Sequence, residues 1–445
     1  PSRGKAHGPV AFLASTATYL AYANDINAIL MAPLIGGKDA VLPEEELLVA
    51  HPEFGRSLYH KHVDGFGIHF SSYLRPTVNI RPDSRAWSLT ADLDIVHWLE
   101  KSDIDYEVIT DEQLHHEGEE LLANFSVLVT GAHPEYYSQA MRDGIDAFTH
   151  AGGRLMYMGG NGFYWKVAYS DAWPAAIELR RAEDGTRAWR SQAAEYYQQF
   201  DGELGGLWLR QELPPQKLVG VGFAAQGNPG GMRFRKGVAV HDPRIGFAFE
   251  GVETDIIADY GKMKASAMGE EVDRVDYSLG TPAHAIVLAS SENHHASMLR
   301  CKEELFLILP QIVDQDSKAD VVFFEVEGGG AVFSTGSIAW SSVLAFNHFD
   351  NPSAKLTMNV LRRFMDPALF YPPETENPIE TLLPEVYQMP PGLRIDQFSY
   401  GRMLWESLRK ALMLIALPIM LKAKNIAMPA PAPRRDTVLG DHKRG

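Results

Sequence analysis

The chain has 445 residues, of which 45% are hydrophobic and 22% are charged, a composition typical of soluble globular proteins. Its formal net charge of -16 argues against nucleic acid as a partner, because binding to the phosphate backbone requires a basic surface. The length predicts two or three domains, or one large α/β domain with insertions.

The single cysteine, Cys301, excludes an internal disulfide bond and favours a reducing, cytoplasmic location. We expect Cys301 to be a buried structural thiol on a helix, within LRCKEELF. The first residues, PSRGKAHGPV, contain neither a starting Met nor a signal peptide, which indicates that the chain begins inside a longer gene product. The longest apolar run, 411–421, contains a proline and is shorter than the ~20 residues of a membrane span. It therefore predicts a packing or subunit-contact helix, and no membrane association.

The first third of the chain alternates short apolar runs with amphipathic stretches, which predicts alternating strands and helices. The predicted strands are 9–16, 106–110, 126–131 and 154–160, and the predicted helices are 91–103, 111–125 and 138–150. This order, with short connections, is typical of an α/β fold with a doubly wound parallel sheet. Ligands of such sheets bind at the carboxyl ends of the strands, so the loops that follow 9–16, 126–131 and 154–160 are candidate sites.

The character of the sequence changes after residue 170. Gly-rich and charged stretches in 171–263 predict a mostly β insertion between 1–170 and 264–370, the two parts of the α/β domain. The second part contains predicted strands at 283–290, 319–326 and 328–337 and a predicted helix at 353–364. Residues 371–445 are rich in proline, and we expect a C-terminal extension that is disordered or bound to a partner.

The sequence lacks several motifs of nucleophilic catalysis and nucleotide binding: there is no GxSxG, no Walker loop, and no GxGxxG after the first strand. The histidine clusters at 60–62, 115–116 and 294–295 are expected on the surface, because adjacent side chains diverge on strands and helices. His133 and Glu135, in VTGAHPEYYS, are two residues apart and point to the same side of an extended segment. Such a pair is common by chance, so a polar turn and a functional site both stay open at this point.

Eight stretches, in order across about three quarters of the chain, together resemble the large subunit of N,N-dimethylformamidase and its relatives. They are TYLAYAND (18–25), GRSLY (55–59), SSYLRPTVNIRP (71–82), VTGAHPEYYS (129–138), GGNGFYWKV (159–167), IELRRAEDGTRAW (177–189), EEVDRVDYSLGTPAHAIVLASS (270–291) and GGGAVFSTGSIAW (328–340). Each stretch alone is weak evidence for the resemblance, whereas all eight in the same order along the chain are specific evidence. The resemblance implies a sheet similar to class I glutamine amidotransferases without their cysteine nucleophile, and no Cys follows the strand 126–131.

The resemblance also implies a mononuclear ferric iron, Fe(III), held by two tyrosines and a glutamate. The glutamate corresponds to Glu135 and one tyrosine to Tyr59, while Tyr22 and Tyr19 compete for the other position. Tyr22 is favoured, because the AYN core recurs in relatives whose Tyr19 position is not a tyrosine. Ferric iron is a hard cation that prefers anionic oxygen ligands, and a strong Lewis acid is needed to displace phenol protons. Without the resemblance, these tyrosines would be interpreted as ordinary core or rim aromatics.

By the same resemblance, His133 lies beside the metal and pairs with Glu271 of EEVDR for acid–base catalysis. Asn161 would bind the substrate and help to stabilise the tetrahedral oxyanion, although Asn-Gly is also a common turn pair.

A cationic side chain of the pocket corresponds to Arg181, with Arg180 as the alternative. Phe163 and Trp165 are candidates for an apolar wall around a small methylated substrate, and equally for plain core.

The resemblance thus implies an iron-dependent amidohydrolase that cleaves N,N-dimethylformamide to formate and dimethylamine by metal-assisted attack of water. Relatives work with a small second subunit, so a hetero-oligomer is expected. The alternatives are a hydrolase of another small amide at the same site, and a non-catalytic amidotransferase-like assembly module. The chain begins at its first strand, so we expect the all-β N-terminal domain of the large subunit to be a second chain, a cleaved product or a truncation.

Overall fold

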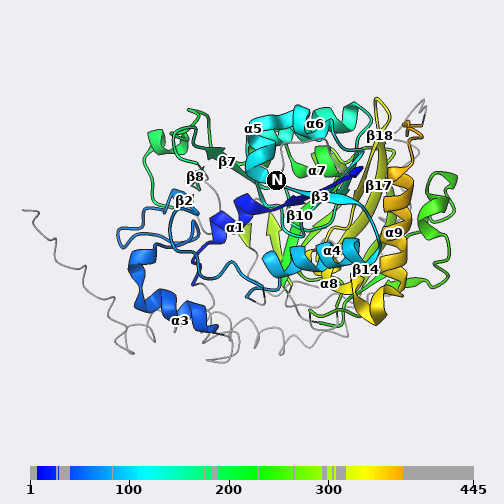
Figure 1. Cartoon of the computed structure of the whole chain (residues 1–445), viewed down its shortest axis with the longest axis horizontal. Coiled ribbons are helices and arrows are strands. Elements are labelled where there is room, and N and C mark those ends of the chain that lie inside the picture. Colours follow the sequence, from blue (N-terminus) through cyan, green and yellow to red (C-terminus); the bar gives the residue numbers. More distant parts are fainter. Residues whose placement is uncertain are drawn as a thin grey trace, which may run out of the picture. The chain divides into compact units, whose positions relative to one another are not determined.

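The computed structural model describes residues 8–26, 29, 41–82, 84–174, 176–181, 189–227, 230–263, 266–292, 298–302, 305–306 and 317–373. These residues form a mixed α/β fold whose strands are arranged in three sheets (Figure 1). The HH pair at 294–295, the predicted helix at 411–421 and the extension from residue 374 onward lie outside the described residues.

A nine-stranded sheet forms the centre of the fold, in the order β12-β11-β14-β17-β18-β6-β4-β1-β3. Its strands are β1 (Val10–Ala14), β3 (Tyr106–Thr110), β4 (Val127–Thr130), β6 (Arg154–Tyr157), β11 (Arg233–Lys236), β12 (Ile256–Ala258), β14 (Ile286–Glu292), β17 (Asp320–Val326) and β18 (Gly330–Ser334). The run β18-β6-β4-β1-β3 is parallel, whereas the pairings from β18 to β12 are antiparallel. The sheet is therefore mixed, and its similarity to glutamine amidotransferases stays a prediction.

Helices cover both faces of this sheet (Figure 1). They are α1 (Thr16–Tyr22), α5 (Asp111–Leu122), α6 (Gln139–His150) and α7 (Pro215–Val219) on one face, and α4 (Leu89–Lys101), α8 (Ser341–Leu344) and α9 (Pro352–Met365) on the other. Alternate residues of a strand point to opposite faces, which explains why β1 contributes to two cores. Phe12 packs in the core with Trp98 of α4, while Leu13 packs in the core with Ile145 of α6.

The two smaller sheets are built from shorter strands. One has the order β13 (Glu270–Arg274), β10 (Gly222–Gly227), β15 (Leu299–Lys302) and β16 (Leu305–Phe306); the other has the order β2 (Phe70–Ser72), β8 (Ala176–Leu179), β7 (Trp165–Tyr169) and β5 (Tyr136–Tyr137), with β9 (Gly206–Leu207) paired to β7. Outside the sheets, the chain forms α3 (Pro43–Ala50) and the 3-10 helices η2 (Pro52–Phe54), η3 (Ala193–Tyr196), η4 (Trp208–Gln211), η5 (Pro243–Phe249), η6 (Tyr277–Leu279), η8 (Ile338–Trp340) and η9 (Phe346–Phe349).

The structure confirms the strands and helices predicted in the first third of the chain and in 283–364, with boundaries that differ by a few residues. The range 171–263, predicted as an insertion, contributes strands to all three sheets, and its status as a separate unit stays a prediction. The helix predicted around Cys301 is wrong, because Cys301 lies in β15 and pairs with Phe306. Apolar and basic residues alternate in LRCK, which is the period of a strand. The expectation that this thiol is buried is confirmed.

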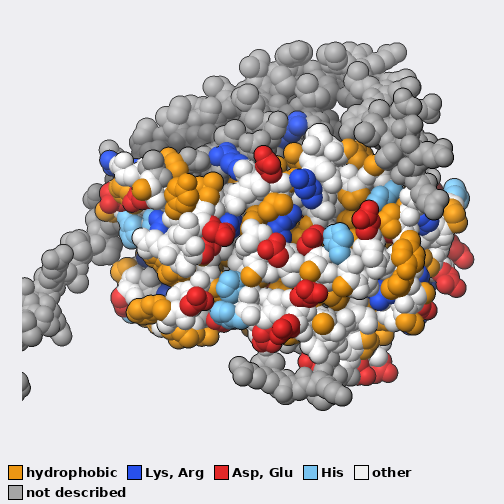
Figure 2. All heavy atoms as spheres, turned by 90° about the horizontal axis from the view of Figure 1, so that it is seen from above, with side chains coloured by type: hydrophobic (Ala, Val, Ile, Leu, Met, Phe, Trp, Pro, Cys, Tyr) orange, Lys and Arg blue, Asp and Glu red, His pale blue; other side chains and the backbone are white. Residues whose placement is uncertain are grey.

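Acidic and basic side chains are interspersed on the face of the molecule shown in Figure 2.

Among the helices that the structure describes, none is long and apolar enough to cross a membrane.

Candidate functional site

The loop between β4 and β5 is held in place from three sides. The Gly131 N–H group donates to the Leu13 carbonyl at 3.0 Å, and the Ala132 N–H group donates to Asp92 Oδ1 at 2.7 Å. The N–H group of Glu135 donates to Thr18 Oγ1 at 3.0 Å. A Cβ atom added at Gly131 would lie 2.4 Å from Asp92 Oδ2, so this position requires glycine. The loop is thus fixed at the carboxyl ends of parallel strands, as predicted.

Two tyrosines share the buried carboxylate of Glu135. The hydroxyl group of Tyr22 lies 2.9 Å from Glu135 Oε2, and that of Tyr59 lies 2.9 Å from Glu135 Oε1. The two phenol oxygens are 2.6 Å apart, and the two rings stack with their centroids 4.4 Å apart. Tyr136 donates its own hydroxyl to Tyr59 Oη at 2.7 Å. The structure therefore brings together the three residues predicted as iron ligands.

Tyr19 lies elsewhere. Its hydroxyl group donates to the buried carboxylate of Asp92, which also accepts the N–H group of Ala132. Tyr22, three residues further along α1, is the tyrosine of this helix that faces Glu135. The geometry thus favours Tyr22 over Tyr19 for the position that the sequence left open.

The phenols of this cluster are hard to ionise without a cation. Burial raises the pKa of Tyr22 well above its usual value, and the Glu135 carboxylate raises it further. Burial and Glu135 likewise raise the pKa of Tyr136. These hydroxyl groups therefore keep their protons at neutral pH until a cation offsets the charge of a phenolate.

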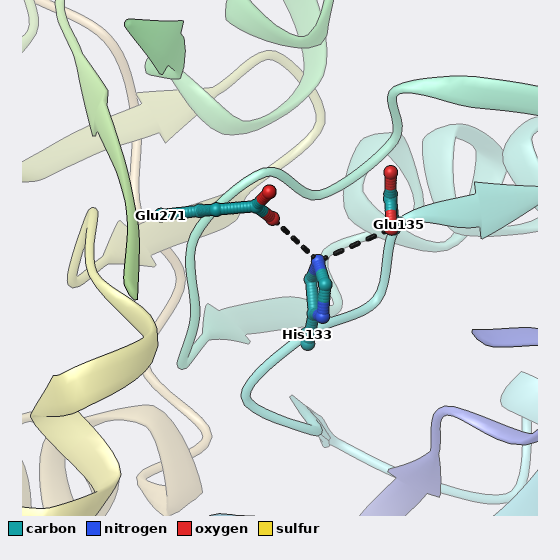
Figure 3. A group of neighbouring side chains, drawn as sticks. All are labelled: His133, Glu135 and Glu271. Carbon is teal, nitrogen blue, oxygen red and sulfur yellow. Dashed lines mark ion pairs between the residues drawn. The ribbon is translucent and has the colours of Figure 1, made fainter. Parts of the chain in front are cut away.

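His133 lies between two carboxylates (Figure 3). Its Nε2 atom is 2.8 Å from Glu271 Oε2 and 3.3 Å from Glu135 Oε2. Burial lowers the pKa of His133, but the carboxylates of Glu271 and Glu135 outweigh this effect and raise the pKa to about 10. Donor atoms of the three side chains lie within 4.8 Å of one another, a second arrangement that could hold a metal ion and that also includes Glu135.

The loop after β6 places Asn161 next to this pair. Asn161 Nδ2 donates to Glu271 Oε2 at 2.9 Å, and the backbone N–H group of Asn161 donates to Asp273 Oδ1 at 2.6 Å. Asn161 Oδ1 is buried and has no hydrogen-bond partner among the described residues. A Cβ atom added at Gly160 would lie 2.3 Å from the Glu271 carbonyl oxygen, so glycine permits the close approach of this loop to β13.

The two arginines of IELRRAE have different environments. The guanidinium group of Arg181 is buried over the rings of Tyr59 and Trp165, at 4.2 and 4.5 Å from their centroids. Arg180 pairs instead with Glu178, at 2.5 Å. Of the two arginines, Arg181 is thus the one that contacts Tyr59, which is predicted to bind the iron.

A cavity of about 240 Å³ opens beside Tyr22, His133 and Glu271. Its other lining residues, which the sequence did not indicate, are Trp87, Gln226, Gly227, Glu270, Leu299 and Ile338. Phe163 and Trp165 are not among them: Phe163 is fully buried between Tyr137 and Tyr157, and Trp165 is buried beneath Arg181. The structure therefore places both aromatics in the core, which is the alternative the sequence left open.

The other histidine clusters only partly follow the sequence prediction. His62 and His116 are exposed as expected, whereas His60 and His115 are half-buried. The Nε2 atom of His60 lies 3.2 Å from Asp25 Oδ1, and the ring of His115 stacks on Tyr169. Within the described residues, His133, Glu135 and Glu271 form the one cluster of His, Cys, Asp and Glu that could hold a metal.

The fold and the site define an α/β protein with buried phenol, carboxylate and imidazole groups at the carboxyl ends of parallel strands. The family model described as "N,N-dimethylformamidase beta subunit-like, C-terminal" matches residues 2–351, and the chain belongs to this family. It is 35% identical to the N,N-dimethylformamidase beta subunit of Paracoccus aminophilus and 34% identical to that of Alcaligenes sp.. Each match covers 82% of this chain and 50% of the relative, so the chain spans about half the length of these relatives.

The comparisons confirm the predicted family and name the beta subunit. The predicted status of a large, catalytic subunit is not part of those names and stays a prediction.

Proposed function

We propose that this chain carries the active site of an iron-dependent amidohydrolase that cleaves N,N-dimethylformamide to formate and dimethylamine. One observation carries this proposal: the oxygen cluster of Tyr22, Tyr59 and Glu135 and the His133–Glu271 pair meet beside one cavity. The names of the two relatives support an amide substrate and a place in a subunit of an amide-cleaving enzyme.

The donor set of Tyr22, Tyr59 and Glu135 fits a ferric ion. Two phenolates and a carboxylate carry three negative charges, which match the charge of Fe(III), and a hard cation prefers such oxygens. Both phenol oxygens already lie 2.9 Å from carboxylate oxygens of Glu135. When bound, the ion would supply Lewis-acid chemistry, which polarises the amide carbonyl and lowers the pKa of water.

Glu271 is the proposed general base and acid. It lines the cavity, and its Oε2 atom is held by His133 at 2.8 Å and by Asn161 at 2.9 Å. Its carboxylate takes a proton from the attacking water and returns that proton to the nitrogen of the leaving dimethylamine. This return is necessary because the leaving nitrogen of a tertiary amide carries no proton of its own.

Asn161 has a different proposed role from the oxyanion stabilisation that the resemblance suggested. One N–H bond of its carboxamide is already directed at Glu271, whereas the buried Oδ1 atom has no partner among the described residues. We assign Asn161 the tasks of orienting Glu271 and accepting a hydrogen bond from the attacking water.

The cavity is small and partly apolar, which suits a small methylated amide. Its volume of about 240 Å³ is below the roughly 300 Å³ at which pockets for drug-sized ligands begin. Trp87, Leu299 and Ile338 provide apolar surface for methyl groups. Gln226 also lines the cavity, and its side-chain amide favours a second candidate substrate, a small amide with N–H groups. Rates with dimethylformamide, formamide and acetamide separate these two substrate classes.

Iron analysis and activity of matched tyrosine variants test the site. We expect Tyr22→Phe, Tyr59→Phe and Glu135→Gln to lose bound iron, the visible phenolate-to-iron absorption and amide hydrolysis. Tyr19→Phe is the control, because its hydroxyl group contacts Asp92 instead. If all three variants keep iron and activity, the proposed site is wrong. A colourless, metal-free wild type without amide hydrolysis would support the assembly module.

We also propose that the chain works in a hetero-oligomer with a small second subunit. The relatives are named as beta subunits, which supports a further chain in the assembly. Co-purification followed by mass measurement of the complex tests this; a chain that is fully active as a monomer would contradict it.

A further inference from the structure

A second carboxylate, Asp273, lies behind the proposed general base. Asp273 and Glu271 are two residues apart on β13, so they point to the same side of the strand. Asp273 is fully buried, and its Oδ2 atom accepts the hydroxyl hydrogen of Tyr157 at 2.7 Å. Its Oδ1 atom accepts the backbone N–H group of Asn161 at 2.6 Å. The hydroxyl oxygen of Tyr157 in turn accepts the N–H group of Gly162 at 2.7 Å. Two consecutive amides of the loop after β6 are thus anchored.

These contacts hold Asn161 in an unusual backbone conformation. Its φ angle is +51°, in the left-handed region, which asparagine adopts more readily than most residues but which still needs support from its surroundings. In this conformation the side chain reaches Glu271, with Nδ2 at 2.9 Å from Oε2.

We propose that Asp273 and Tyr157 are positioning residues that clamp Asn161 and, through it, orient the Glu271 carboxylate beside His133. The clamp rests on the proposed function, in which Glu271 moves the proton. Neither clamp residue lines the cavity, so both act through the loop. Displacing a catalytic group by about 1 Å costs on the order of 100-fold in rate, so the clamp should affect turnover more than substrate binding.

The matched pair Tyr157→Phe and Tyr137→Phe tests the clamp. Both tyrosines are fully buried and both contact Phe163, but the hydroxyl group of Tyr137 has no hydrogen-bond partner among the described residues. We expect Tyr157→Phe to lower kcat by roughly 10- to 100-fold with little change in KM, and Tyr137→Phe to leave kcat nearly unchanged. Equal effects of the two substitutions would overturn the clamp.

A double-mutant cycle shows whether the effect passes through Asn161. If it does, Tyr157→Phe causes little further loss of kcat in an Asn161→Ala background, because the side chain it positions is already gone. Losses that multiply would overturn the proposal.

Hydrogen exchange of the backbone amides tests the clamp without any activity. In Tyr157→Phe and in Asp273→Asn, the amides of Asn161 and Gly162 should exchange faster than in wild type and in Tyr137→Phe. Unchanged exchange overturns the clamp whatever the enzyme does. A wild type that hydrolyses no amide overturns the proposed function instead, and exchange still decides whether the clamp exists.

Discussion

Replacing Asp273 with asparagine should change how the stability of the protein depends on pH. Burial raises the pKa of Asp273 from 3.8 to about 7, although hydrogen bonds from Tyr157 and Asn161 oppose this shift. The folded protein therefore binds a proton between these two pH values that the unfolded chain has already released. For a carboxyl group with a raised pKa, stability is highest below pH 3.8 and falls as the pH rises towards 7.

The size of the pKa shift of Asp273 determines how much the stability changes with pH. About 3 pKa units at 1.36 kcal/mol each correspond to about 4 kcal/mol of lost stability between the two pH values. Asparagine cannot ionise, so this pH-dependent contribution disappears in Asp273→Asn, while its disturbed hydrogen bond to Tyr157 adds an offset that does not vary with pH.

The assay is urea unfolding of wild type and Asp273→Asn at pH values from 4 to 8. The free energy of unfolding of wild type minus that of the variant should fall as the pH rises to about 7 and be constant above it. Tyr157→Phe removes a hydrogen bond that lowers the pKa of Asp273, so the fall should continue to a higher pH than in wild type. A difference that is constant across the whole pH range refutes the reasoning.

Three further substitutions probe the loop after β6, the packing of Arg181 and the environment of His115 in α5. Gly160→Ala places a Cβ atom 2.3 Å from the Glu271 carbonyl oxygen, so we expect a roughly 100-fold loss of kcat with an unchanged circular dichroism spectrum; normal turnover would contradict this close approach. Arg181→Lys loses the stacking of a planar group on Tyr59 and Trp165 and should cost about 1–2 kcal/mol, measured by urea unfolding, and an equally stable variant would show that stacking is unimportant. Burial, and next His116, lower the pKa of His115 to about 4, so the folded state resists protonation and loses stability as the pH falls from 6.5 towards 4. His115→Gln should therefore show a smaller drop in Tm between pH 7 and 5 than wild type, and an equal drop would argue against the shift.

The sequence was most informative about site residues in loops that directly follow strands, because the order of elements along the chain fixes where these loops lie. Strands that precede helices place their following loops at one edge of a sheet, which is why the loop with Glu135 and the loop with Asn161 could be located. The choice between Tyr19 and Tyr22 depended on the direction of each hydroxyl group, which residue type does not specify.

Other parts of the site depended on long-range packing. Trp87 and Gln226 reach the cavity from segments with no recognisable motif, and no sequence pattern indicated them. The sequence does carry a signal for Asp273, which is two residues from Glu271 on one strand, and a buried acidic residue requires partners. Aromatic content alone did not distinguish Phe163 and Trp165 as wall or core, because their surroundings come from strands and loops distant in the chain.

The hydrogen bonds of the site join residues that are synthesised far apart in time. Tyr22 bonds to Glu135, which follows it by 113 positions, and Asn161 bonds to Glu271, which follows it by 110 positions. A nascent chain that has emerged only as far as β7 already holds both tyrosines and Glu135, but it lacks Glu271 and Asp273. Under the proposed function, the three residues that would hold the metal are therefore synthesised before the carboxylate that would move the proton.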